Sequence, residues 1–183
     1  MAPNRYTFIL VVLLLLLAIL ANPAYPSVGE IGQVKGSGVL ERGSNVVIEG
    51  DVGVGVQSMD TAVTANGTMR IDFIDETRVD LTQQSRLVID EFVFDPANDI
   101  GSLSMKASLG TVRYASGQIA KKYKQNVKIR TPSATIGVRG TDFVMVVDEV
   151  GGSMITLLPS CDTAGMCYVG EITVETDAGM VIM

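Results

Sequence analysis

Apolar and polar residues alternate in short runs throughout the part of the chain that follows Pro26, and this pattern restricts the fold more than any other feature. In residues 68–74 the alternation places Met69, Ile71 and Phe73 on one face. The same period of two recurs in several later runs, whereas no stretch after Pro26 keeps a helical period of 3.6. Short runs of this kind, separated by Gly, Asp and Asn, are typical of β-strands. We therefore expect one all-β domain, either a β-solenoid-like roll or a twisted sandwich.

The run Asp142–Val147 differs from the others, because every residue after its first is apolar. Such a run suits a strand that is buried on both faces, and hence a central strand. The pair Gly151-Gly152 follows it and predicts a hairpin turn into the next strand, Met154–Leu158. The best candidate for a helix is Gly117–Gln125, and Phe94–Ser102 is expected to be irregular.

The extreme N-terminus carries an apolar run, Phe8–Ala21, behind a short segment whose one charged side chain is Arg5. A membrane-spanning helix needs about 20 residues, so this run has the length of the apolar part of an export signal. We expect residues 1–24 to be a signal peptide. Cleavage after Ala21, cleavage after Ala24 and retention as an anchor all stay open.

The composition argues against several functional classes. Histidine is absent, which removes the commonest general base and the commonest metal ligand. The net charge is −6, so phosphate neutralisation offers little and nucleic acid is not an expected partner. The carboxylates do not match the spacing of a calcium loop. A glycosidase needs two carboxylates about 5–10 Å apart in a cleft, which the sequence does not show. We expect no enzymatic activity, no catalytic residue, no cofactor and no metal.

Cys161 and Cys167 are the two cysteines of the chain, and they lie between two strand-like runs. In an oxidising compartment such a pair can close the tip of a hairpin. A redox-active pair would more often be spaced as C-x-x-C, and a metal site would need further ligands. The spacing therefore favours a disulfide.

The stretch Thr131–Phe143 reads TPSATIGVRGTDF and has the most distinctive local chemistry of the chain. Pro132 favours an extended entry into this stretch. Gly137 and Gly140 each allow a backbone conformation or a close approach that a β-carbon would block.

Arg139 lies between these two glycines and offers five hydrogen-bond donors. In an all-β domain such an arginine most often holds nearby carbonyls or a carboxylate, and Asp142 is the obvious local candidate. We interpret the segment Gly137–Thr141 as a structural corner. A surface for a partner or ligand is the alternative.

The same stretch resembles the signature of the FecR domain family, whose most recognisable segment reads TP-x-A-x-x-GVRGT-x-F. The matching residues are Thr131, Pro132, Ala134, Gly137, Val138, Arg139, Gly140, Thr141 and Phe143. Residues 59–64 are similar to the family's GD-x-I-x-T element, with Met59 in place of the usual glycine. Residues 69–81 are similar to its l-x-F-x-DGT-x-l-x-L element, with Glu76 where glycine is common. Residues 109–114 are similar to its l-x-G-x-l-r strand.

The resemblance covers roughly residues 28–158, and it implies an extracytoplasmic, β-rich, non-catalytic domain of the bacterial cell envelope. In the regulators that name the family, this domain senses an outer-membrane receptor and signals to a cytoplasmic sigma factor. Those regulators carry a cytoplasmic anti-sigma region before their membrane helix, whereas about seven residues precede the apolar run here. We therefore expect a stand-alone FecR-like β domain over residues 28–183, periplasmic or secreted.

The expected function is that of an interaction module that binds a protein or an envelope polysaccharide. The alternative is a sensor component of a trans-envelope signalling system. Contact with a membrane is expected only through an uncleaved signal segment.

Positive charge is concentrated in residues 121–130 of this acidic chain. The cluster consists of Lys121, Lys122, Lys124, Lys128 and Arg130. Such a cluster can contact lipopolysaccharide phosphates, an anionic polysaccharide or an acidic partner. The alternative is a solvated strand edge on which lysine prevents pairing with another sheet.

Overall fold

The structure is a computed structural model, and it describes residues 26–161 and 165–183. The predicted signal peptide, residues 1–24, lies outside the described residues, as do its two candidate cleavage sites. None of the helices in the described ranges has the length and hydropathy needed to cross a membrane.

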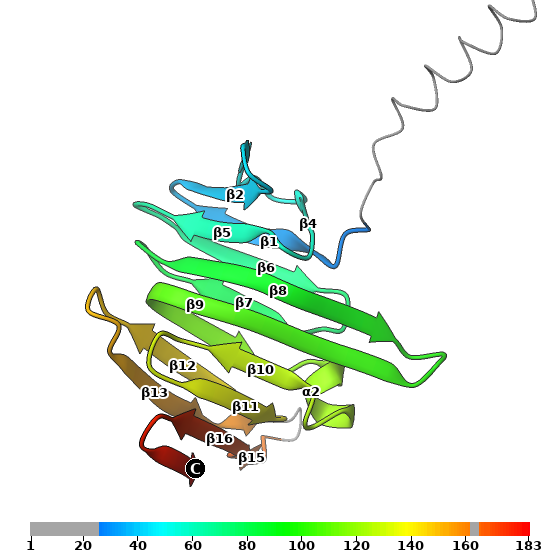
Figure 1. Ribbon diagram of the computed structural model, residues 1–183. Coiled ribbons are helices and arrows are strands. Elements are labelled where there is room, and N and C mark those ends of the chain that lie inside the picture. The colour runs from blue at the N-terminus through cyan, green and yellow to red at the C-terminus, as the bar shows by residue number, and fades with distance from the viewer. Residues whose placement is uncertain (1–25, 162–164) are drawn as a thin grey trace, which may run out of the picture.

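The described chain is built almost entirely from β-strands, which confirms the predicted all-β fold (Figure 1). The elements are β1 (Gly29–Lys35), β2 (Gly38–Arg42), β3 (Val46–Glu49), β4 (Gly55–Val56), β5 (Thr61–Thr64), β6 (Thr68–Phe73), β7 (Arg78–Leu81), β8 (Arg86–Asp95), β9 (Ile100–Ala115), α2 (Gln118–Lys122), β10 (Val127–Arg130), β11 (Thr135–Arg139), β12 (Asp142–Val147), β13 (Ser153–Leu158), β14 (Ser160–Cys161), β15 (Cys167–Tyr168), β16 (Glu171–Thr176) and β17 (Gly179–Ile182).

Fifteen of these strands form one continuous hydrogen-bonded sheet that folds into two layers. One layer, which we call the β7 layer, has the strand order β4-β1-β6-β7-β9-β12-β13. The other, the β8 layer, has the order β3-β2-β5-β8-β9-β10-β11-β16-β17. The strands β14 and β15 form a separate small hairpin.

Strand β9 belongs to both layers, which is why the sheet is continuous. Its first part pairs with β8 and β10, and its last part pairs with β7 and β12. The change occurs at Gly110, whose φ of 88° lies in the left-handed region. A β-carbon at Gly110 would lie 2.6 Å from the Cα of Ser85, so only glycine fits this crossing without movement.

The strand pairing identifies the fold as a twisted sandwich and not as a solenoid. A β-solenoid stacks its strands in parallel, whereas every pair described here is antiparallel apart from β9 with β10. Antiparallel layers of this kind bury one face and leave the other to solvent.

The core lies between the two layers and is continuous. Met69, Ile71 and Phe73 of β6 point into it, as the alternation predicts. The ring of Phe73 stacks on that of Phe92 from the opposite layer, with 5.3 Å between the centroids. Full burial of one such side chain contributes about 2 kcal/mol, so packing between the layers holds the sandwich closed.

The prediction that Asp142–Val147 is buried on both faces is wrong. In β12, Phe143, Met145 and Val147 are buried, whereas Val144 and Val146 are half-exposed. The strand lies next to the edge strand β13, and no third layer of described residues covers its outer face. The predicted hairpin turn is confirmed, because the Gly151 N–H donates to the Asp148 carbonyl at 3.1 Å between β12 and β13.

Two other expected features are present in shortened form. The helix within Gly117–Gln125 is α2, which spans only Gln118–Lys122. The irregular region expected at Phe94–Ser102 is smaller, because β8 continues to Asp95 and β9 begins at Ile100.

Candidate functional site

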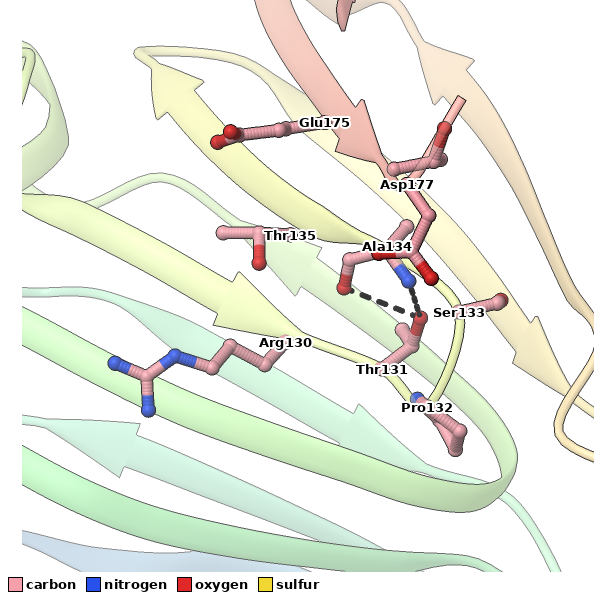
Figure 2. A pocket seen from close by; sticks show the side chains of 9 residues that line it. Arg130, Thr131, Pro132, Ser133, Ala134, Thr135, Glu175 and Asp177 are labelled. Atoms are coloured by element: carbon pink, nitrogen blue, oxygen red, sulfur yellow. Dashed lines mark hydrogen bonds between the residues drawn. The ribbon is translucent and has the colours of Figure 1, made fainter. Parts of the chain in front are cut away.

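The TP-x-A part of the motif forms the turn between β10 and β11 (Figure 2). The Thr131 N–H donates to the Ala134 carbonyl at 2.8 Å, and the Ala134 N–H donates to Thr131 Oγ1 at 3.1 Å. Pro132 therefore lies in a tight turn that directly follows the extended strand β10. Proline suits this place because its fixed φ favours such turns.

The GVRGT part forms the end of β11 and the corner that leads from the β8 layer into β12 of the β7 layer. Gly140 has a φ of 74°, which favours glycine. Thr141 is fully buried, and its Oγ1 accepts a hydrogen bond from the Gly170 N–H at 3.1 Å. Gly137 serves close approach instead, because a β-carbon there would lie 2.4 Å from Thr173 Oγ1 on the neighbouring strand β16.

Arg139 does not pair with Asp142, and the expected local partner is wrong. Its Nη1 lies 2.6 Å from Glu171 Oε1, directly across the β11–β16 pair. Asp142 belongs to the other layer, where it accepts a hydrogen bond from the Ser116 N–H at 3.1 Å. Because the chain turns at Gly140, residues 139 and 142 lie on different layers, which sequence proximity does not reveal.

A polar trough crosses the outer face of the β8 layer on both sides of Lys128. On one side a hollow of about 220 Å³ is lined by Glu91, Ser102, Leu103, Ser104, Gln125, Asn126, Lys128 and Arg130. On the other side a hollow is lined by Lys124, Gln125, Lys128, Thr135, Gly137, Arg139, Thr173 and Glu175. The trough continues to the hollow in Figure 2, beside the Thr131–Ala134 turn, through Arg130, Thr135 and Glu175.

Ser104 forms part of the floor of this trough. The residue is only 8% exposed, and its Oγ has no hydrogen-bond partner among the described residues. Burying a hydroxyl without a partner costs free energy. An unsatisfied hydroxyl beside a surface hollow is therefore an observation that points to a ligand.

The structure brings together only part of the predicted basic cluster. Lys124, Lys128 and Arg130 line the trough. Arg130 lies 3.6 Å from Asp90 Oδ2, whereas Lys124 and Lys128 form no ion pair with any described residue.

The other two lysines of the cluster lie elsewhere. Lys122 Nζ is 2.5 Å from Asp99 Oδ1, and this hydrogen bond raises the pKa of Lys122 and lowers the pKa of Asp99. Lys121 faces a second hollow of about 710 Å³ beside the motif corner. That hollow is lined by Glu76, Arg78, Arg113, Ala115, Ser116, Lys121, Gly140, Asp142, Pro159, Cys161 and Tyr168.

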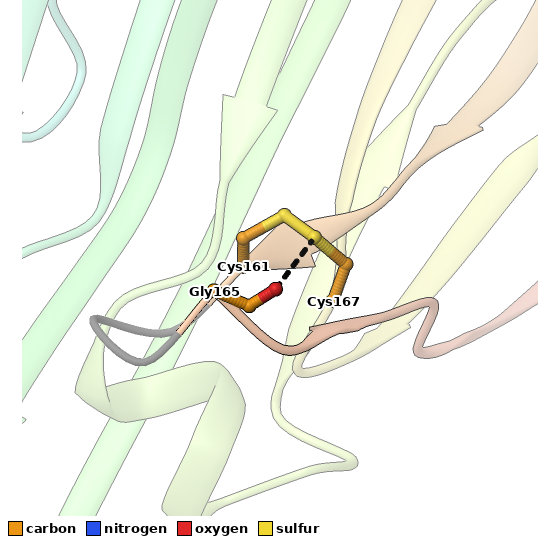
Figure 3. The surroundings of a disulfide bond; sticks show 3 residues. All are labelled: Cys161, Gly165 and Cys167. Atoms are coloured by element: carbon orange, nitrogen blue, oxygen red, sulfur yellow. Dashed lines mark hydrogen bonds between the residues drawn. A yellow bond between two sulfur atoms is a disulfide. The ribbon is translucent and has the colours of Figure 1, made fainter.

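The predicted disulfide between Cys161 and Cys167 is present and joins β14 to β15 (Figure 3). The two residues face each other in the hairpin register, and their Cα atoms are 3.9 Å apart. The closed loop is short, so the bond stabilises the fold by about 3 kcal/mol at most. It holds Cys161 and Tyr168 at the wall of the second hollow.

The upstream family elements contain two buried carboxylates that hold turns in place. Asp60 accepts two hydrogen bonds from Arg42, at 2.8 and 2.7 Å. Asp75 accepts from the backbone N–H groups of Thr77 and Ile119, and so ties the β6–β7 turn to the start of α2. These two carboxylates are engaged in holding the turns of the fold.

The two positions at which the chain replaces a family glycine both have left-handed backbone. The φ of Met59 is 71° and that of Glu76 is 68°. Side chains with a β-carbon adopt this region at a cost of roughly 1–2 kcal/mol. The geometry thus explains why glycine is usual at both places.

Sequence reasoning missed Ser104 and Gln125 as residues of the trough. Ser104 does occupy the polar phase of β9, between the inward-facing Leu103 and Met105. The alternation places it on the outer face, but it gives no sign that Lys128 lies beside it.

In residues 26–161 and 165–183, no three acidic or cysteine side chains are grouped closely enough to hold a metal ion.

Comparison with known proteins supports the resemblance. The family model described as FecR protein matches residues 60–159, more than half of the chain. Comparisons with curated proteins and with solved structures gave no match. The matched region contains the Thr131–Phe143 motif, its corner at Gly140 and most of the trough. This chain therefore belongs to the FecR family, a signalling and regulatory family associated with the cell envelope.

Proposed function

We propose that this protein is a non-catalytic interaction module of the bacterial cell envelope, and that it binds its partner in the trough on the outer face of the β8 layer. The observation that carries the proposal is the combination of two unpaired cations, Lys124 and Lys128, with the unsatisfied hydroxyl of Ser104. Membership of a family not known for enzymatic activity supports a binding role.

The geometry of the trough supports binding to a surface that is already formed in the free protein. Its floor consists of neighbouring strands of one sheet, so Ser104 and Lys128 are held in register by backbone hydrogen bonds. A rigid floor lowers the entropy lost when a partner binds. The cations also stand out on a chain with a net charge of −6, so they favour a partner with negative charge.

Affinity capture from an envelope extract tests this proposal. The exported protein is immobilised and compared with the double variant Lys124→Glu/Lys128→Glu. We expect the double variant to lose most of the captured material, because both unpaired lysines of the trough are reversed. The control is Lys35→Glu, which reverses one cation on β1 of the other layer, outside the trough. Equal capture by all three proteins would contradict the proposal.

Export to the periplasm or the cell surface is part of the same proposal, and the apolar run at residues 8–21 supports it. Cell fractionation followed by the mass of the purified protein tests export. A mature chain that begins at Asn22 or Tyr25 would identify the cleavage site, whereas an intact membrane-bound chain would identify an anchor. Recovery in the cytoplasm would contradict export.

A second candidate function is that of a sensor component in a trans-envelope signalling system. Membership of a signalling and regulatory family favours it. Deletion of the gene would then change the activity of an envelope-responsive sigma factor, measured with a transcriptional reporter. Unchanged reporter activity in the deletion strain, under conditions in which the partner is present, would contradict the sensor role. Binding would then be the remaining function.

A further inference from the structure

We infer that the ligand of the trough is an anionic polysaccharide that lies across the strands from β8 to β16. The inference rests on the proposed interaction role and assigns its chemistry. The strand register places five residues side by side along this path. They are Glu91, Ser104, Lys128, Gly137 and Thr173.

The floor of the trough is lined by small and polar groups. Ser102, Ser104, Thr135 and Thr173 offer hydroxyls, and Gly137 has no side chain. Hydroxyls and amides are the groups that hydrogen-bond to sugars, and a floor of small residues lets a chain approach the sheet closely. The buried Ser104 Oγ would gain the partner that it lacks in the free protein.

The charges of the trough favour an anion over a neutral glycan. Arg139 is neutralised by Glu171 at 2.6 Å, and Arg130 lies 3.6 Å from Asp90. Lys124 and Lys128 keep their charge unpaired and line the same hollow. The lining carboxylates Glu91 and Glu175 lie on β8 and β16, toward the two ends of the path. The centre beside Lys128 is therefore the place for a negative group.

Other classes of macromolecule fit this surface less well. A protein interface needs an apolar, desolvated centre, and Leu103 is the one large apolar residue among those that line the trough. A nucleic acid is bound through many phosphate contacts, and the acidic chain supplies few free cations here. A glycan chain with separated charges requires only the polar floor and the two lysines.

The dimensions of the sheet suit a linear glycan. Neighbouring strands are about 4.8 Å apart, close to the length of one pyranose ring along an extended chain. Successive sugars would thus lie over successive strands, and an acidic sugar above β10 would meet Lys128.

The test measures binding of two anionic glycans and one neutral glycan to the exported protein by isothermal titration calorimetry. The probes are oligogalacturonate, which carries carboxylates, phosphomannan, which carries phosphates, and dextran. We expect one or both anionic glycans to bind, with an affinity that falls as salt is added. Dextran is expected not to bind.

The variants separate the trough from a general effect of charge. Lys128→Glu should weaken binding about tenfold or more, because it places like charges together. Lys35→Glu should leave the affinity unchanged. Ser104→Ala should weaken binding about threefold to tenfold, the effect of one lost hydrogen bond. The thermal midpoint of Ser104→Ala should not fall, because the unsatisfied hydroxyl is removed from the free protein.

The results distinguish a glycan that carries carboxylates from one that carries phosphates, and they also show whether the inference holds. Binding of only one anionic glycan would support the inference and identify the source. No binding of either, equal binding of dextran, or equal losses in Lys128→Glu and Lys35→Glu would overturn it. If capture from the envelope extract still depends on Lys124 and Lys128 while both glycans fail to bind, the proposed function stands and only the ligand class is wrong.

Discussion

The central strands of the two layers differ in the charges that they carry on their outer faces. On the β7 layer, the arginines of the central strands are paired with carboxylates on neighbouring strands: Arg70 with Asp80 at 2.7 Å and Arg78 with Asp72 at 2.9 Å. On the β8 layer, arginines are paired as well, Arg86 with Glu41 and Arg139 with Glu171, but Lys106 of β9 and Lys128 of β10 form no ion pair within the described residues. The central strands of the β7 layer are therefore neutralised, whereas those of the β8 layer keep free positive charge, and Lys128 lines the trough.

This contrast has a physical meaning, because the two faces rest on the same core. Exposed cross-strand ion pairs contribute little to stability, but they remove free charge from a surface. An unpaired lysine above a small-residue floor contributes nothing to the fold that a neutral residue would not.

The largest predicted effect concerns the strand that joins the two faces. Gly110→Ala would combine left-handed backbone strain with a clash against Ser85. We expect the free energy of unfolding to fall by about 3 kcal/mol and Tm to fall by about 6–12 °C. Circular dichroism and tyrosine fluorescence should report one common transition, because β9 couples both layers.

The matched control for this change is Gly53→Ala. Gly53 has nearly the same φ, 86°, but a β-carbon there meets nothing within 4 Å. Gly53→Ala should lower the free energy of unfolding by only about 1 kcal/mol. Equal losses in the two variants would show that the crossing at Gly110 is not tightly packed.

A smaller effect is expected when an ion pair on the outer face of the β7 layer is removed. Asp80 lies opposite both Arg70 and Arg113, and its hydrogen bond raises the pKa of Arg70. Asp80→Asn should lower the free energy of unfolding by about 0.5–1 kcal/mol at low salt, and by less at high salt, in chemical denaturation. Lys106→Gln removes an unpaired cation of the other face and should cost nothing measurable. A comparable loss in both would erase the contrast between the faces.

The smallest effect sharpens the contrast on the binding face itself. Glu171→Gln would free Arg139 at the edge of the trough, and the affinity for an anionic glycan that binds the trough should rise about threefold. The pair is exposed, so the free energy of unfolding should change by less than about 0.5 kcal/mol. Titration calorimetry and denaturation of the same variant check both values, and an unchanged affinity would indicate that Arg139 lies outside the site.

Local patterns in the sequence predicted the strands well. The alternation in residues 68–74 anticipated β6 and its three buried side chains, and Gly151-Gly152 anticipated the β12–β13 turn. These predictions succeed because a pleated strand sends successive side chains to opposite faces whatever its neighbours are. The disulfide was equally accessible, since both cysteines lie in one short loop.

Predictions that needed a neighbour were less successful. Asp142 is three residues from Arg139, yet the turn at Gly140 sends the two to different layers. The apolar residues of β12 suggested burial on both faces, but the place of a strand in the sheet depends on its partners.

The sequence alone determined that this protein is an all-β member of the FecR family with a disulfide hairpin and a glycine corner, because those features are encoded by short, local patterns. The tertiary structure decided that β9 serves two layers, that Arg139 pairs with Glu171, and that Ser104 and Lys128 lie side by side. Those relations depend on hydrogen bonding between strands far apart in the chain, and alternation within a strand carries no record of which strand will lie next to it.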